Sequence, residues 1–371
     1  MAGNSKGSAD ARPPALSRAS LLARLATIGI VIASVVAAFA YVGGWFSPHR
    51  LTPARFIDTF EKVNGIHPGF RRNHAKGVCV TGFFDSNGDG VRLSKAVVFR
   101  RGRVPVIGRF ALAGGNPYAA DSSGTVRSMA LLYRLPDGEQ WRTGMNNIPV
   151  FVVSTPTAFR DQLVAFAADP ATGNPDPVKV KEFLAKYPES ARAIGAIKSH
   201  PPSSGFADST YNSLNAFRFI DAAGNSIAVR WSMVSAQPSA EADAPRSASQ
   251  DKNYLFDALI SRINQPSQAP LQWHLMVTLG RPGDPTDDAT IAWPDNREHV
   301  EVGTLTIDHI ESEATGACRD VNYDPLVLPS GIAPSDDPLL SARSATYSQS
   351  FRRRAGETKL PSAVTPAEIR Q

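Results

Sequence analysis

The chain has 371 residues, of which 20% are charged and 42% hydrophobic, so a folded protein is expected and a disordered one is excluded. The formal net charge is +5, but the basic residues are scattered in short runs rather than gathered in one stripe, so nucleic-acid binding is not expected. The two cysteines, Cys79 and Cys318, lack a CxxC spacing and do not indicate zinc, while one disulfide between them stays open for a domain outside the cytoplasm.

The N-terminal region contains 22 consecutive residues without a charge, Leu25–Phe46. As a helix this segment is roughly 33 Å long, enough to cross the hydrocarbon core of a bilayer. Residues 1–24 carry four basic side chains and one acid, so the positive-inside rule predicts a cytoplasmic flank and an outward-facing remainder. We expect a membrane anchor with the remaining domain in the periplasm. A cleaved signal peptide, with Ala38–Ala40 as the cleavage motif, would instead release that domain.

The region that follows begins with a helix, because Thr52 suits an N-cap and Pro53 the first helical position, and we expect it to end near Asn64. Residues 221–225 predict the turn of a hairpin. Many strands with turn signals between them are typical of an antiparallel barrel or sandwich. The segments expected to form strands are Gly77–Phe84, Val104–Ala113, Val126–Leu135, Asn215–Ile220, Ala228–Met233, Leu271–Leu279 and Val302–Ile310.

Further helices are expected between and after these strands, at Thr157–Ala167, Pro177–Tyr187, Asn253–Asn264 and Pro338–Ser350. The segment Ala236–Asp251 is rich in Ser, Ala, Pro and Asp, which favours a surface loop. Residues 356–371 are expected to form a flexible tail.

One polar segment, Asp85–Gly90, matches the first half of an EF-hand calcium loop. Such a loop needs a carboxylate at its twelfth position, because a bidentate Glu completes the coordination of the ion. That position here is Ala96, and no helix is expected on either side. The segment is therefore interpreted as a polar turn.

Five short segments together indicate a family, although each is weak alone. Arg71–Gly77, with His74 followed by Ala, Lys and Gly, resembles the distal-histidine segment of heme catalases. In the family's order there follow Gly108–Ala111, Asn146–Phe151, Trp293–Pro294 with Val302–Leu305, and Pro329–Ile332 with Arg343–Tyr347. The resemblance covers about residues 50–355, and the short chain looks most like the compact catalase-related peroxidases. It implies an α+β fold, an eight-stranded antiparallel β-barrel with surrounding helices, here preceded by one transmembrane helix.

The resemblance also implies a heme b site with two sides. On the distal side His74 would move protons on a bound peroxide, since an imidazole titrates near neutrality, and Asn146 would orient the peroxide by a hydrogen bond. Phe151 and Phe159 would line this pocket. On the proximal side Tyr347 would be the axial ligand of the iron.

Three arginines match family positions that hold the heme propionates, namely Arg71, Arg109 and Arg354. Arg343 precedes Tyr347 by four residues, so on a helix the two side chains share a face and the guanidinium favours the phenolate. One departure concerns Ala111, because the family often has a hydroxyl residue there that supports the distal histidine. A second departure is Ser348–Ser350, where large catalases have Pro-Asp-Thr.

The function expected from the resemblance is reduction of hydrogen peroxide or organic hydroperoxides with a small-molecule electron donor. A true catalase, in which a second peroxide is the donor, is the nearest alternative, and a hydroperoxide isomerase is another. A heme sensor or carrier without catalysis, or a β-domain without heme, belongs to a different class. The sequence leaves the donor, the natural peroxide and the oligomeric state open.

Overall fold

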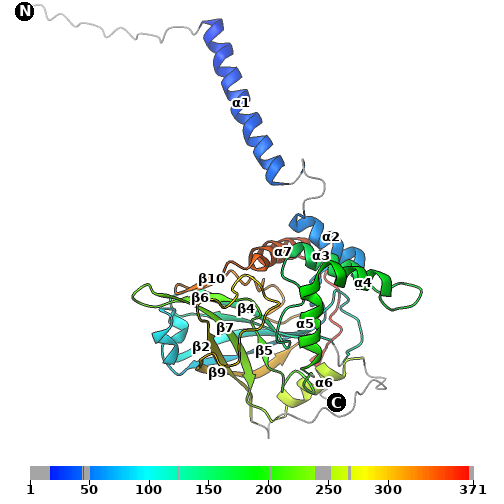
Figure 1. Ribbon diagram of the computed structural model, residues 1–371, viewed down its shortest axis with the longest axis vertical. Helices are drawn as coiled ribbons and strands as arrows, with labels where there is room; N and C mark the ends of the chain where they lie inside the picture. Colours follow the sequence, from blue (N-terminus) through cyan, green and yellow to red (C-terminus); the bar gives the residue numbers. More distant parts are fainter. Residues whose placement is uncertain are drawn as a thin grey trace, which may run out of the picture. The chain divides into compact units, whose positions relative to one another are not determined.

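The computed structural model describes residues 17–43, 45, 51–122, 125–200, 202–238, 252–265 and 269–366. The chain divides into two compact units, Met1–Thr52 and Pro53–Gln371 (Figure 1).

The first unit contains one helix, α1 (Arg18–Val42), within its described residues. Ser17 caps it, because its side chain accepts a hydrogen bond from the backbone N–H of Ser20. The helix therefore begins seven residues before the predicted Leu25, while the predicted end at Phe46 lies outside the described residues. By length and composition α1 could cross a membrane, a test that a signal sequence passes as well.

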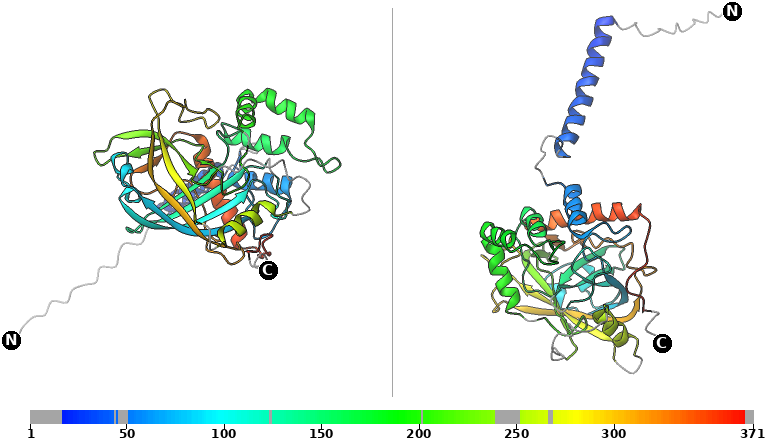
Figure 2. Two further views of the ribbon diagram at one scale, coloured as in Figure 1. Left: turned by 90° about the horizontal axis from the view of Figure 1, so that it is seen from below. Right: turned by 90° about the vertical axis from the view of Figure 1, so that its right-hand side faces the viewer.

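The second unit is built on a closed antiparallel barrel. Eight strands follow one another around it in the order β7-β5-β4-β3-β2-β1-β9-β8, and pairing of β7 with β8 closes the ring (Figures 1 and 2). Strands β6 and β10 extend the sheet from β7. The strands are β1 (Gly77–Ser86), β2 (Gly102–Leu112), β3 (Arg127–Arg134), β4 (Gln140–Asn146), β5 (Tyr211–Asn212), β6 (Phe217–Ile220), β7 (Ser226–Ser235), β8 (Leu271–Leu279), β9 (His299–Glu311) and β10 (Ile332–Pro334). The predicted eight-stranded barrel is confirmed.

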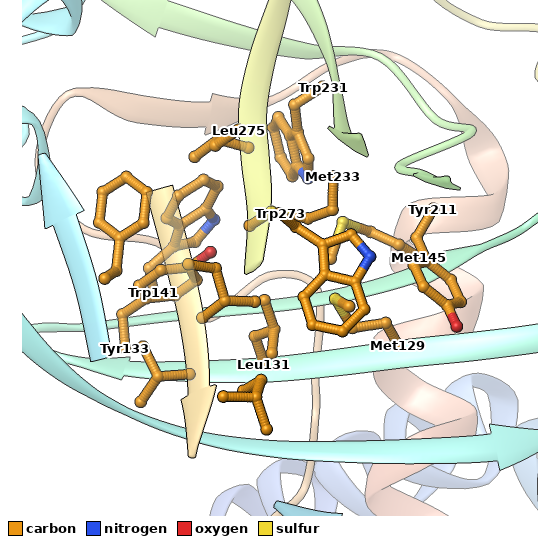
Figure 3. Close-up of a cluster of buried hydrophobic side chains, with 14 of the residues drawn as sticks. Met129, Leu131, Tyr133, Trp141, Met145, Tyr211, Trp231, Met233, Trp273 and Leu275 are labelled. Carbon is orange, nitrogen blue, oxygen red and sulfur yellow. The ribbon is translucent and has the colours of Figure 1, made fainter. Parts of the chain in front are cut away.

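Large side chains fill the barrel interior (Figure 3). Buried and less buried residues alternate along β4 and β8, as strands with one face in a core require. The ring of Trp141 stacks on Tyr133 at 4.8 Å and meets Trp231 edge-on at 5.1 Å, and all three are fully buried. An interior packed in this way leaves no room for a large ligand, so a cofactor site has to lie outside the barrel wall.

Helices α2 (Pro53–Asn64), α3 (Pro156–Ala165) and α7 (Pro338–Ala355) contact one another over one side of the barrel (Figures 1 and 2). Caps begin two of them, since the Thr155 side chain accepts from the N–H of Ala158 and that of Asp337 from the N–H of Leu339. Proline follows each cap at the first helical position. The remaining helices are α4 (Pro177–Lys186), α5 (Pro188–Lys198), α6 (Tyr254–Ile263) and the short 3₁₀ turns η1 (Asp89–Arg92) and η2 (Val97–Phe99).

A disulfide joins Cys79 on β1 to Cys318 in the segment after β9, 239 residues away. The sequence left this pairing open. Both cysteines are fully buried. The bond ties the segment after β9 to the barrel wall, and that segment contributes to the cavity described below.

Several expectations need correction. Four elements, β4, β5, β10 and α5, were missed, while each strand and helix expected after Thr52 is present, α2 and β8 with the expected ends and the others with shifted ends. Residues 356–366 are not a loose tail, because Val364 is 1% exposed and its carbonyl accepts from Ser312. The EF-hand-like segment is the end of β1 followed by η1, and Asp85 there pairs with Arg103. Residues 239–251 of the expected loop and 367–371 lie outside the described residues.

Candidate functional site

A cavity lies between the outer face of strands β2–β4 and helices α2, α3 and α7. The space between its lining atoms, with its open mouth included, is about 1320 Å³. All nine residues expected in the site from the sequence line it, although they come from distant parts of the chain. They are Arg71, His74, Arg109, Asn146, Phe151, Phe159, Arg343, Tyr347 and Arg354.

The backbone of His74 is held in an unusual conformation. Its φ is +53°, in the left-handed region that residues other than glycine rarely occupy. The side-chain oxygen of Asn73 accepts hydrogen bonds from the N–H of His74 and the N–H of Gly114, both at 3.0 Å. These two bonds hold the turn that directs the imidazole into the cavity. Strain maintained in this way is typical of functional positions.

The imidazole of His74 is held by a serine that sequence reasoning missed. The Oγ of Ser128 lies 3.0 Å from the Nδ1 of His74. The same hydroxyl donates to the Oδ1 of Asn146. Ala111 provides no hydroxyl, and Ser128 on the neighbouring strand β3 supplies one to His74 instead.

The charge state of His74 follows from its surroundings. Burial, together with the positive charges of Arg109, Arg343 and Arg71, lowers the pKa of His74 to about 3. The ring is therefore neutral at physiological pH and has one N–H and one free nitrogen lone pair. Such a ring can accept a proton from a ligand in the cavity.

Three of the arginines gather around a single buried carboxylate, Glu313, which sequence reasoning also missed. Arg109 binds it with two nitrogens, at 3.0 and 2.7 Å, and Arg71 donates to the same carboxylate. Burial raises the pKa of Glu313, but the charges of Arg109 and Arg71 outweigh burial and hold it below its ordinary value. Arg354 donates to the carbonyls of Arg319 and Val321.

Among the residues that the structure describes, this cluster of Arg71, Arg109, Arg354 and Glu313 leaves two positive charges without a buried anion. Burial and the charge of Arg71 lower the pKa of Arg354 to about 9, so its guanidinium stays charged at neutral pH. Unpaired buried charges are costly, and arginine pairs well with carboxylates. A ligand with two carboxylates beside a large apolar body fits this charge pattern, and the two propionates of a heme have that form.

A glycine of the histidine segment makes room for this cluster. A Cβ added at Gly77 would lie 2.4 Å from the Nη2 of Arg109 and 2.7 Å from the carbonyl oxygen of Phe110. A larger residue would displace the Arg109 side chain, and its contact with the Phe110 carbonyl would require a shift of β1 against β2. The glycine after Ala-Lys in the motif thus has a packing reason.

Tyr347 and Arg343 lie on α7, and the guanidinium carbon of Arg343 is 5.7 Å from the centre of the Tyr347 ring. Arg343 is itself held, because its Nη1 donates to the Oδ1 of Asn215. The Nδ2 of Asn215 donates in turn to Asp337, at 2.7 Å, and Asp337 caps α7. Asn215 and Asp337 were not predicted. The chain of contacts fixes Arg343 beside the tyrosine.

Aromatic side chains form the apolar wall of the cavity. Phe159 on α3 packs edge-on against Phe151 at 5.4 Å and Phe60 at 6.0 Å, and it contacts Phe56 at 5.6 Å. Phe56 and Phe60 belong to α2, so the first helix of this unit takes part in the wall. A flat apolar ligand would find matching surface here.

The family model described as catalase matches residues 46–365. The chain belongs to the catalase family. A catalase-related peroxidase of Synechococcus elongatus is 37% identical over 88% of this chain and 96% of its own length. One of Mycolicibacterium paratuberculosis is 33% identical, over 82% and 96%.

Solved structures show the same fold. A bacterial catalase superimposes with a TM-score of 0.69 at 21% identity, over 84% of this chain and 63% of its own. Catalase A from Saccharomyces cerevisiae also gives 0.69, at 19% identity, over 83% and 66%. The chain therefore spans about two thirds of the length of these solved catalases. Proteins of the catalase family generally bind heme, and the arginine cluster and apolar wall fit that group.

Proposed function

We propose that the protein is a heme-dependent peroxidase, an oxidoreductase that reduces hydrogen peroxide or organic hydroperoxides with electrons from a small-molecule donor. The observation that carries the proposal is one cavity that combines a neutral imidazole, a fixed amide, a tyrosine beside an arginine, and a buried excess of two positive charges. The names of the two relatives, catalase-related peroxidases, support the same activity.

Heme b is the cofactor that we propose. Arg71, Arg109 and Arg354 would hold its propionates, and the Tyr347 oxygen would bind the iron as phenolate. Arg343 lies beside the ring of that tyrosine. Bound heme supplies the electron-transfer chemistry that the side chains of the cavity lack.

The protein's own part is to move protons and orient the peroxide. The Nε2 of His74 removes the proton from one peroxide oxygen and delivers it to the other, so that the O–O bond breaks with water or an alcohol as the leaving product. Asn146 donates its Nδ2 hydrogen to the peroxide and fixes its orientation. Two electrons and two protons, taken up from the donor and solvent, complete the reduction of ROOH to ROH and water.

The experiment is to purify the full-length protein, load it with heme, and follow peroxide together with dissolved oxygen. We expect peroxide loss that depends on an added donor such as guaiacol, with little oxygen released. Oxygen release that accounts for all the peroxide without a donor would identify a catalase instead. Bound heme without peroxide consumption would identify a carrier or sensor.

We also propose that α1 anchors the protein and that residues 53–371 lie in the periplasm. The helix is long and apolar enough for this role. The buried disulfide is a second support, because structural disulfides persist mainly in oxidising compartments.

A further inference from the structure

Ser128 occupies a central place on the cavity-facing side of three strands. In the register of the sheet it lies directly opposite Ala111 on β2 and directly opposite Asn146 on β4. Side chains directly opposite in antiparallel strands project from the same face, with Cβ atoms about 4.5–5.5 Å apart. All three residues line the cavity, and Ser128 is 8% exposed. The serine thus stands between the strand position that lacks a hydroxyl and the amide of the site.

The hydroxyl of Ser128 contacts both groups that would act on a ligand. Its Oγ lies 3.0 Å from the Nδ1 of His74 and hydrogen-bonds the Oδ1 of Asn146. A serine hydroxyl has one hydrogen to donate and can accept through its lone pairs. The direction of one hydrogen bond therefore sets the direction of the other.

The number of available hydrogens sets the direction of these two hydrogen bonds. The amide Oδ1 of Asn146 only accepts, so the Ser128 hydrogen points toward it, and the Oγ must then accept from His74. The neutral imidazole consequently has its hydrogen on Nδ1, and the lone pair of Nε2 is free. The amide, with its oxygen toward Ser128, presents its Nδ2 hydrogens on the other side. The reverse direction would place two acceptors against each other and remove the free base.

We propose that Ser128 is a positioning residue that sets His74 and Asn146 together, fixing the Nδ1–H form of the imidazole and turning the Asn146 Nδ2 toward the peroxide. The proposal rests on the proposed peroxidase function. In this proposal a residue of β3 supplies the hydroxyl that holds His74, because the residue opposite it on β2, Ala111, has none.

The test compares three variants of the heme-loaded, full-length protein. Ser128→Ala removes the hydroxyl. The double variant Ala111→Ser/Ser128→Ala moves the hydroxyl to the opposite residue on β2. Ser190→Ala is the matched control, because Ser190 on α5 is also a buried serine, its hydroxyl has no hydrogen-bond partner among the described residues, and it does not line the cavity.

Two readouts separate positioning from folding. The first is the second-order rate of reaction with peroxide, followed in the Soret band by stopped flow. The second is the affinity of the ferric protein for cyanide, which binds as the anion after its proton moves to a base and which requires no turnover.

We expect Ser128→Ala to retain its heme and to react about 10–100-fold more slowly, as found when a partner that orients a ligating or catalytic group is lost. Its cyanide affinity should fall, the double variant should recover both values to within about threefold of the parent, and Ser190→Ala should match the parent.

Parent-like rate and cyanide affinity in Ser128→Ala would overturn the proposal. If that variant loses heme or unfolds, the double variant decides: restored heme content with a rate that stays low also overturns it. Should the parent protein itself fail to react with peroxide, the proposed function fails, which is a distinct result.

Discussion

At the scale of single residues, Tyr347 is the residue on which heme binding should depend most directly. Among the cavity residues it is the one that we propose as a ligand of the iron. Tyr347→Phe keeps the ring but removes the oxygen, so we expect heme content to fall or the absorption spectrum to change to another ligation type. Heme content and spectrum measured on purified protein check this, and an unchanged spectrum would refute the assignment.

His74 should matter for the reaction and not for retention of heme. His74→Ala removes the group that moves the proton, and general acid–base catalysis contributes roughly 10²–10⁴-fold. We expect a loss of that size in the rate of reaction with peroxide at unchanged heme content. Asn146→Ala should cost less, about 10²–10³-fold, as for one lost transition-state hydrogen bond. Stopped-flow measurement of both variants provides the check, and a His74→Ala protein as fast as the parent would rule out the site.

Glu313 permits a prediction with two opposite signs. Glu313→Gln leaves Arg71 and Arg109 without their anion, and breaking a buried pair costs about 3–5 kcal/mol of stability in the heme-free protein. The same change removes the carboxylate that competes with the propionates, so we expect slower heme loss.

Thermal unfolding and heme transfer to an excess of a heme-scavenging protein measure the two effects. Asp284→Asn is the control, because Asp284 forms a part-buried pair with Arg297, also through two nitrogens, and does not line the cavity. Asp284→Asn should lower thermal stability without changing the rate of heme loss. Faster heme loss in Glu313→Gln would show that Glu313 serves to position the arginines.

At the scale of elements, the segment after β9 connects the disulfide to the arginine cluster. The carbonyl of Cys318 accepts from Arg71, at 3.0 Å, and that of Val321 accepts from both Arg71 and Arg354. The disulfide fixes one end of this segment to β1. Holding the segment therefore also holds two of the groups proposed to bind propionates.

Removal of the disulfide should consequently affect both stability and heme retention. For Cys79→Ser/Cys318→Ser we expect a loss of about 2–5 kcal/mol in the free energy of unfolding, typical of a native disulfide, together with faster heme release. Unfolding and heme-transfer experiments with and without a thiol reductant test this. The parent should respond to the reductant and the double variant should not; equal heme release in both proteins would contradict the link.

At the scale of the whole molecule, the remaining question is the side of the membrane on which residues 53–371 lie. Four basic residues against one acid precede the apolar segment, so the positive-inside rule places the N-terminus in the cytoplasm. A reporter enzyme that works only in the periplasm should be active when it is fused after Ser47. Activity of a cytoplasm-specific reporter at the same position would contradict the proposed topology, and a shortened, soluble product would indicate cleavage after a signal sequence.

Much of the site was accessible from the sequence, because the resemblance rests on local segments. Each of these segments is only a few residues long, as in the histidine segment, Asn146–Phe151 and Arg343–Tyr347. A motif that short can be recognised in the sequence without knowledge of where the segment lies in the fold. All nine expected residues indeed line one cavity. Alternation along the strands, also a local pattern, favoured an antiparallel barrel or sandwich, and the resemblance to the catalase family implied the barrel.

The tertiary structure alone decided the partners of these residues. Ser128, Asn215, Glu313 and the Cys79–Cys318 bond act across 54, 128, 204 and 239 residues of chain, and no local pattern marks them. Strand register determines which side chains face each other, and a hydrogen bond depends on a separation of about 3 Å that spacing in sequence does not encode. The sequence by itself thus determined the family, the barrel and the residues that meet in the cavity, whereas only the tertiary structure decided that the hydroxyl beside His74 comes from β3, because that contact depends on position in space.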